Sequence, residues 1–247
     1  MPTTLGVLRR VVPAPTMKDI TFAQRDFPVQ PNSVSRRIEG VPRAVIEGFQ
    51  YGADHAGTEE IVRRLGWIDP LYRGLAYEGA IGALILRDLL AGGRTQRAEE
   101  FVRGPAAPYA PLAYIGCGLV LARVPRSLWS RAVPWLESDP LLPWLRWLAI
   151  DGYGFDKAYF NPKRWVFGRA LPKPYPFDDA PDYFLSVFHQ GVGRALWFIF
   201  GGGVAAIPGV IERFPVARRA DLWSGVGASS TYIGGPSRTD FHALVTA

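Results

Sequence analysis

Cysteine and lysine are both scarce in this chain of 247 residues. The single cysteine, Cys117, excludes an internal disulfide, and a structural zinc site would lack thiolate ligands. Cys117 lies in the apolar run 114–122, which favours a small buried residue over a reactive thiol. Only four of the 28 basic residues are lysines. Positive charge is therefore carried mainly by arginine, which suits anion pairing and aromatic stacking.

Blocks of like charge are also missing, although the net charge is +6. The basic residues are scattered, with no run of five or six, so nucleic acid is not the expected partner. Charged residues make up only 20% of the chain and hydrophobic residues 48%. This composition excludes an intrinsically disordered chain, which needs few apolar groups and many charges.

Long uninterrupted apolar runs are absent as well. Two uncharged stretches, 105–122 and 195–211, approach the lower length limit of a membrane-spanning helix. Proline interrupts the first, and glycine and proline interrupt the second, so buried soluble helices are favoured over spans. A peripheral membrane contact stays open. No signal peptide is evident in residues 1–15, and a cytoplasmic location is the expectation.

The apolar spacing predicts a mainly α protein, a single-domain helical bundle over residues 41–247 after an irregular segment, 1–40. Thr58 is the expected N-cap of the first helix, and Gly92-Gly93 the expected stop of the second. Residues 151–183 are rich in aromatics and proline, which predicts a long, packed loop of the kind that often carries function. Helices are expected at 59–65, 75–90, 112–124, 128–136, 141–150, 184–200, 204–214 and 218–233.

Three of the four carboxylates that are candidate proton carriers precede residue 160. Glu78 lies within the most apolar predicted helix, where desolvation would raise its pKa and suit it to general acid catalysis. The alternative is an ion pair with Arg73 or Arg123. Asp151 and Asp156 bracket the sequence DGYGFD, where they could share a proton or a cation, or simply serve a turn.

The segment HQGVGRALW, residues 189–197, combines one histidine with two glycines inside a predicted helix. Glycine at such positions costs about 1 kcal/mol each, so a ligand or a second helix is expected to approach closely. His189 is a candidate acid or base, although a lone histidine also suits a satisfied core position. Arg194 is placed to hold an anion, and Trp197 to line the same pocket.

The segment 218–232 contains further polar and aromatic groups near a predicted helix start. Asp221 is a candidate proton carrier, and Arg218 and Arg219 candidate anion ligands. Small residues facing a neighbouring helix are the alternative. Four aromatic residues elsewhere in the chain are candidate substrate contacts: Tyr77, Tyr153, Trp223 and Tyr232.

A weak metal motif occurs at Asp178, Asp179 and Asp182, which match the DDxxD pattern that binds magnesium and diphosphate in class I terpene synthases. Prolines around the motif break the helical geometry that such ligands need, and short patterns of this kind recur by chance. No cofactor is therefore expected, and Mg²⁺ would be needed only if the substrate were a diphosphate.

Five ordered segments resemble the bacterial family known as domain of unknown function 1702. They are AYEGA at 76–80, YIGCGLVLARV at 114–124, DPLLPWLRWLAIDGYGFDKAYF at 139–160, GVGRALWFIFGG at 191–202 and RRADLWSGVGASSTYIGG at 218–235. The chain departs from the family pattern at His189, where an aspartate is expected. The resemblance implies an accessory role in specialised metabolism, since members are often described as enediyne biosynthesis proteins and accompany polyene-making polyketide clusters.

Residues and resemblance together predict a cofactor-independent isomerase or cyclase acting on a hydrophobic polyene, of enediyne-type polyketide or isoprenoid origin. Aromatic faces would stabilise developing positive charge, and burial would tune a carboxyl group to act as an acid. The alternative is a non-catalytic carrier of an unstable hydrophobic intermediate, or an accessory of a synthase. The oligomeric state is left open.

Overall fold

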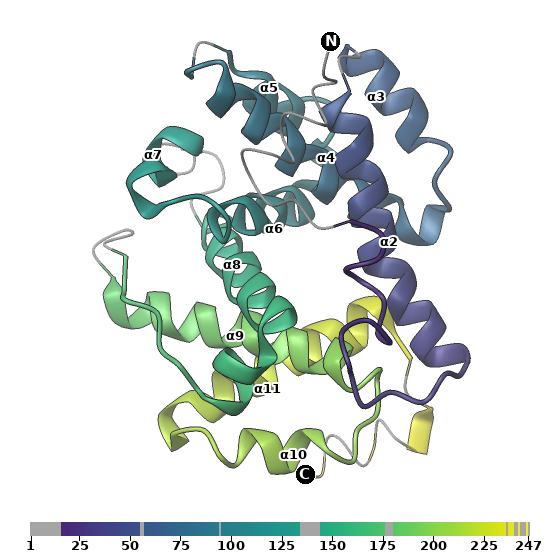
Figure 1. Ribbon diagram of the computed structural model, residues 1–247, viewed down its shortest axis with the longest axis vertical. Coiled ribbons are helices and arrows are strands. Elements are labelled where there is room, and N and C mark those ends of the chain that lie inside the picture. The colour runs from purple at the N-terminus through teal and green to yellow at the C-terminus, as the bar shows by residue number, and fades with distance from the viewer. Residues whose placement is uncertain are drawn as a thin grey trace. The chain divides into compact units, whose positions relative to one another are not determined.

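The computed structural model describes residues 16–54, 57–93, 95–133, 144–175, 180–235, 237–239, 242 and 246. Within these ranges the regular structure is helical and no strand occurs, which confirms the predicted mainly α class (Figure 1). None of the helices found there is both long and apolar enough to cross a membrane.

Contacts group the residues into two compact units. Unit 1 comprises Met1–Met17 and Pro42–Tyr153, and unit 2 comprises Lys18–Val41 and Gly154–Ala247. One boundary follows Met17, and the other two fall inside helices, α2 (Ser33–Ala53) and α8 (Trp147–Phe160). Each unit therefore takes part of both helices.

Unit 1 is built around α4 (Pro70–Leu90), which packs against α6 (Ala110–Leu121) and α5 (Arg97–Arg103). Almost every α4 residue from 74 to 86 is buried, as the apolar residues around the whole helix predict. Smaller elements complete the unit: α3 (Thr58–Leu65), η1 (Ala107–Tyr109), η2 (Arg126–Leu128) and α7 (Trp129–Ala132).

Glycines set the helix spacing in unit 1. A Cβ added at Gly79 of α4 would lie 1.8 Å from the carbonyl oxygen of Val45 in α2. On the other side of α4, a Cβ at Gly116 of α6 would lie 2.3 Å from the carbonyl oxygen of Glu78. Only glycine permits these backbones to approach so closely.

Of the two predicted helix ends, the stop of α4 is confirmed and the N-cap of α3 is not. Gly92 and Gly93 follow α4 with φ of +74° each, so the predicted glycine stop is confirmed. The α4 start is capped by Asp69, whose carboxylate accepts from the Leu71 N–H at 2.9 Å. The Thr58 cap was wrong, because Gly57 occupies the N-cap position of α3 and Thr58 is the first helical residue.

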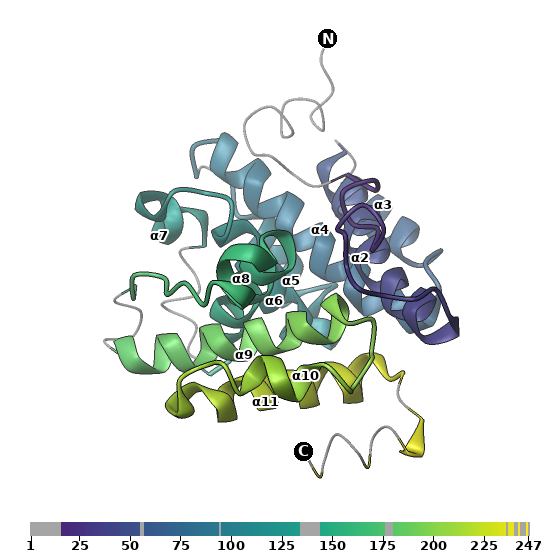
Figure 2. The same cartoon turned by 60° about the horizontal axis from the view of Figure 1, so that its bottom comes forward.

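Unit 2 contains the second part of α8, the π-helix η4 (Lys163–Phe167), α9 (Pro181–Ile199), α10 (Ile207–Ile211) and α11 (Val216–Ile233). Helices α9 and α11 form the most extensive pairing in the unit and lie side by side in Figure 2. A Cβ at Gly193 would lie 2.0 Å from the Leu222 carbonyl oxygen, and one at Gly225 would lie 1.9 Å from that of Gln190.

The predicted loop at 151–183 was wrong at both ends. Residues 151–160 belong to α8, 163–167 form η4, and 181–183 begin α9. Gly152 and Gly154 suggested turns, but in α8 they are packing positions, where an added Cβ would lie 2.2 Å from the carbonyl oxygens of Ile115 and Phe188 respectively.

Other predicted boundaries also shift. Helix α2 begins at Ser33, inside the segment expected to be irregular. The predicted helix 204–214 shortens to α10, and 128–136 to the single turn of α7 with its end outside the described residues. Of the predicted helix 141–150, residues 141–143 lie outside the described residues, 144–146 form a turn, and 147–150 begin α8.

Candidate functional site

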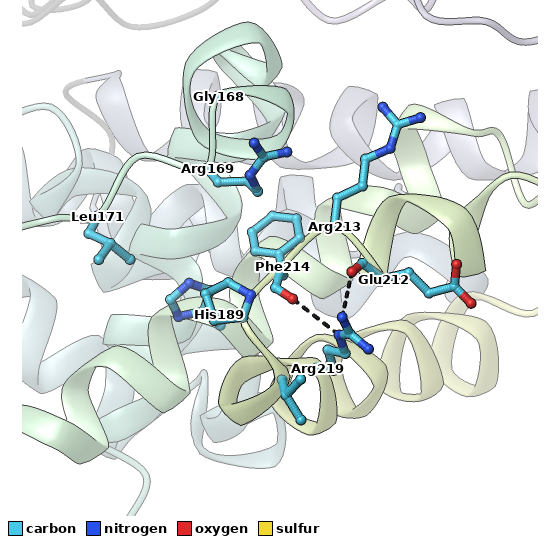
Figure 3. A pocket seen from close by; sticks show the side chains of 10 residues that line it. Gly168, Arg169, Leu171, His189, Glu212, Arg213, Phe214 and Arg219 are labelled. Carbon is cyan, nitrogen blue, oxygen red and sulfur yellow. Dashed lines mark hydrogen bonds between the residues drawn. The ribbon is translucent and has the colours of Figure 1, made fainter.

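A cavity of about 550 Å³ opens within unit 2. Three segments line it: the chain after η4 (168–171), the middle of α9 at His189, and the connection from α10 into α11 (212–219) (Figure 3). Its apolar wall is formed by Leu171, Phe214 and Val216, and its polar groups come from His189, Glu212 and three arginines.

His189 is the buried titratable group of this cavity. Only 2% of the residue is exposed, and its ring lies edge-to-face against Phe188 and Phe214. Nδ1 lies 2.7 Å from the Leu185 carbonyl oxygen one turn earlier, an acceptor that requires Nδ1 to carry the proton. Nε2 then keeps its lone pair, and none of the described residues hydrogen-bonds to it.

The surroundings of His189 keep the imidazole neutral. Burial lowers its pKa from the ordinary value, and the nearby Arg218 guanidinium lowers it further. The Leu185 carbonyl and the Asp221 carboxylate act in the opposite sense, with smaller effects than burial. A neutral imidazole whose Nε2 lone pair is not engaged is in the protonation state that a general base needs, and the lowered pKa makes it a weaker base than an exposed histidine.

Arg218 and Asp221 are the charged residues of α11 near His189, and Arg218 joins α11 to α9. Arg218 Nη1 donates to the Ser186 Oγ at 2.9 Å and lies 3.5 Å from an Asp221 carboxylate oxygen. Both side chains are half-buried. The structure thus brings the predicted residues His189, Arg218 and Asp221 together, with the charged pair adjacent to the histidine.

Arg219 connects the cavity wall to the α10–α11 connection. Its Nε donates to the Phe214 carbonyl oxygen at 3.1 Å and its Nη2 to that of Glu212 at 2.6 Å (Figure 3). These bonds satisfy carbonyls near the end of α10 and hold the Phe214 ring at the cavity. Part of the guanidinium predicted to bind an anion is therefore committed to the backbone.

Two further arginines, Arg169 and Arg213, line the cavity, and neither was singled out by the sequence analysis. Both residues are exposed, and neither guanidinium has a hydrogen bond or ion pair with any described residue. Arg169 has a φ of +51°, a left-handed conformation that is unfavourable for a residue with a Cβ. No motif marks either arginine, but the basic segment KRWVFGRALPK at 163–173 could have drawn attention to Arg169.

Several predicted residues of unit 2 lie outside the cavity lining. The Arg194 guanidinium lies over the Phe155 ring, 5.2 Å from its centroid. Trp197 is fully buried in the core, where its ring would be 3.4 Å from a Cβ at Gly202. Asp156 is buried in α8, Trp223 is half-buried, and Tyr232 is 53% exposed.

Four predicted residues belong to unit 1. Glu78 and Asp151 are buried, and each takes part in polar or electrostatic interactions. Tyr77 stacks on Tyr109 with ring centroids 4.6 Å apart, and burial raises its pKa. Tyr153 lies edge-to-face on Trp129 at 5.2 Å. These side chains are held in the packed interior of the unit.

The predicted turn bracketed by Asp151 and Asp156 was wrong, because both residues lie in the continuous helix α8. Five residues of an α-helix turn through about 140° net, so the two side chains leave on different sides of the helix. They also belong to different units. A proton or cation shared across a DGYGFD turn therefore has no structural basis.

The weak magnesium motif falls largely outside the described residues, which exclude Asp178 and Asp179. Asp182 is an exposed residue in the first turn of α9. Across the part of the chain that the structure covers, no cluster of three or more histidine, cysteine or acidic side chains could hold a metal ion.

Fold and site define an all-helical protein with a cationic, histidine-containing cavity. The chain belongs to the family described as "Protein of unknown function (DUF1702)", whose model matches residues 4–247. The resemblance seen in the five sequence segments is thereby confirmed. No curated protein and no solved structure matches the chain.

Proposed function

We propose that the protein is a cofactor-independent acid–base enzyme that isomerises or cyclises a hydrophobic polyene in specialised metabolism. The observation that carries the proposal is His189, a buried imidazole in the cavity lining whose Nδ1 is committed to Leu185 and whose Nε2 has no hydrogen-bond partner among the described residues. The resemblance to proteins that accompany polyene-making clusters supports the biosynthetic setting. The proposed partner is a small molecule and not a nucleic acid.

The proposed reaction is a proton shift. His189 Nε2 removes a proton from an acidic carbon next to the conjugated system, the double bonds rearrange, and the imidazolium returns the proton at another carbon. Atoms and charge balance without a cofactor. Because burial and Arg218 disfavour the imidazolium, the proton is returned readily and the neutral base is regenerated.

The apolar wall supports a greasy substrate. Leu171 is 62% exposed and Val216 76% exposed at the cavity, while Phe214 is buried behind them. Covering such surface with an apolar chain is favourable by about 25 cal/mol per Å². Excluding water would also strengthen the electrostatic interactions around His189.

The test is production of the protein together with a polyene synthase, followed by mass spectrometry of organic extracts. We expect an isomerised or cyclised product with the wild type and none with His189→Gln. His242→Gln is the matched control, since His242 is exposed and does not line the cavity. An unchanged product level in His189→Gln would rule out the catalytic assignment.

A carrier of a hydrophobic intermediate is the second candidate function. The composition of the cavity lining favours this function. Among the described residues that line the cavity, Glu212 is the sole carboxylate, and its side chain is exposed. A carrier needs the arginines and the apolar wall but no proton relay. Unaltered precursor that co-purifies equally with the wild type and His189→Gln would support it.

A further inference from the structure

We propose that Arg169 and Arg213 form an oxyanion-binding subsite at the cavity, which takes the carboxylate or phosphate group of a small molecule. The inference deepens the proposed function, on which its catalytic meaning rests, by naming the class of substrate: an apolar molecule with one anionic end.

The first argument is the availability of the two guanidinium groups. Arg218 donates to Ser186 and approaches Asp221, and Arg219 donates to two carbonyls. Arg169 and Arg213 have no such partner among the described residues. A guanidinium presents paired N–H donors that match both oxygens of a carboxylate or phosphate.

The second argument is the charge balance of the cavity. Arg169, Arg213 and Arg219 line it together with one carboxylate, Glu212. Figure 3 shows the Phe214 ring between Arg169 on one side and Arg219 on the other, with the Glu212 carboxylate directed away from the ring. The lining thus holds an excess of positive charge around an aromatic surface.

The third argument is the start of α11, which also contributes to the cavity. Pro215 is the N-cap, and Val216 and Arg219 belong to the first turn and line the cavity. No side chain caps this end by a hydrogen bond. The Arg218 N–H of this turn is bonded to the Pro215 carbonyl oxygen at 2.8 Å, so the helix dipole is what this end adds to the positive potential of the cavity lining.

The fourth argument is the backbone at Arg169. A residue with a Cβ at φ +51° is strained, and glycine would adopt this conformation without cost. Such residues occur at functional sites and also where helices end, and Arg169 follows the end of η4, with the Ala170 N–H bonded to the Arg164 carbonyl oxygen at 3.1 Å. This turn places the exposed Arg169 in the cavity lining, where its guanidinium has no partner among the described residues.

Anion and base would act together on one molecule. The anionic end would bind Arg169 and Arg213, and the apolar part would cover Leu171, Phe214 and Val216 towards His189. The arginines are then positioning residues, because they fix which carbon of the chain lies next to Nε2.

Binding is tested by isothermal titration of the full chain with inorganic phosphate and, separately, with hexanoate. The variants are Arg169→Gln, Arg213→Gln and the double variant. Arg36→Gln is the matched control, because Arg36 is an exposed arginine of unit 2 that does not line the cavity. Far-UV circular dichroism verifies folding, which loss of two exposed side chains should leave intact.

We expect each single variant to weaken binding about tenfold, the double variant to abolish it, and Arg36→Gln to leave it unchanged. Binding should also weaken when salt rises from about 50 mM to about 500 mM. The stronger of the two probes identifies the anion as phosphate or carboxylate.

The subsite is overturned if neither probe binds, or if the double variant binds as the wild type does. The subsite proposal is wrong and the proposed enzymatic function is supported if His189→Gln abolishes turnover but the double variant keeps the wild-type KM. The subsite proposal is supported and the proposed enzymatic function is contradicted if the double variant loses anion binding and the wild type shows no turnover.

Discussion

His189 shows how one side chain acquires chemistry from its neighbours. The helix supplies the Leu185 carbonyl that fixes the tautomer, and aromatic rings supply the burial that keeps the imidazole neutral. Arg218 and Asp221 place opposite charges nearby, and their effects on the pKa of His189 are opposed. The balance leaves burial as the dominant influence.

The lowered pKa of His189 predicts a pH-dependent stability. Between that lowered pKa and the ordinary value of about 6.5, the unfolded chain binds a proton that the folded chain does not. The free energy of unfolding should therefore be highest above pH 6.5 and fall as the pH drops below it, by up to about 1.4 kcal/mol per pH unit.

Urea unfolding between about pH 7.5 and about pH 5 measures this slope. The wild-type curve should fall more steeply than that of His189→Gln, and His242→Gln should keep the wild-type slope. Parallel curves for the wild type and His189→Gln would show that His189 is as easily protonated in the folded state as in the unfolded chain.

Replacing Arg169 by glycine should raise stability and weaken anion binding. Arg169→Gly removes the left-handed strain and should raise the free energy of unfolding by up to about 1 kcal/mol, after the entropy cost of glycine. Arg169→Ala keeps the strain and should leave stability near the wild type. Both should weaken phosphate binding to the same extent, measured by calorimetry beside urea unfolding. Equal stability of the two variants would contradict the strain.

The sequence identified part of this site. His189 was notable because glycines interrupt its helix, and the Arg218–Asp221 segment because charges precede a run of small residues. Arg169 and Arg213 could not be found this way. They line the same cavity because the chain after η4 and the α10–α11 connection both border it, a tertiary arrangement that no local spacing encodes.

At the scale of elements, the pairing of α9 with α11 depends on two glycines. Gly193→Ala and Gly225→Ala place a Cβ about 2 Å from a carbonyl oxygen of the facing helix. Because both obstacles are backbone, the helices must separate, at a cost of roughly 1–3 kcal/mol or more.

Gly227→Ala is the control in the same helix, since none of the described residues places an atom within 4 Å of the added Cβ. It should gain about 0.5–1 kcal/mol from helix propensity. Urea unfolding should thus shift in opposite directions for Gly193→Ala and Gly227→Ala. Wild-type stability of Gly193→Ala would mean that the two helices pack less closely than the structure has them.

The same chemistry explains which elements were predictable. Apolar periodicity identified α4, α9 and α11 because burial is their main support. The glycines of DGYGFD misled, since a sequence does not tell a turn glycine from one that admits another helix. The start of α2 at Ser33 was missed because the prolines that separate short segments before it, the last of them Pro31, favoured an irregular segment as far as residue 40.

At the scale of the whole molecule, the division into two units was not visible in the sequence. Domain boundaries usually fall in linkers rich in proline, glycine or polar residues. Here one boundary follows Met17 and the other two fall inside α2 and α8, where no change of composition marks them. The division separates the predicted proton carriers: Glu78 and Asp151 belong to unit 1, and Asp156, His189 and Asp221 to unit 2.

This separation allows the two sets of candidates to be compared in one experiment on the full chain. A ligand that binds the folded state suppresses local opening around its site, so amide hydrogen exchange slows there. With phosphate or hexanoate, exchange should slow at 168–171, around His189 and at 212–219, and stay unchanged in α3 and α5. The Arg169→Gln, Arg213→Gln double variant should lose the protection. Protection centred on Tyr77 and Glu78 in α4 would instead place the site in unit 1 and favour Glu78 as the proton carrier.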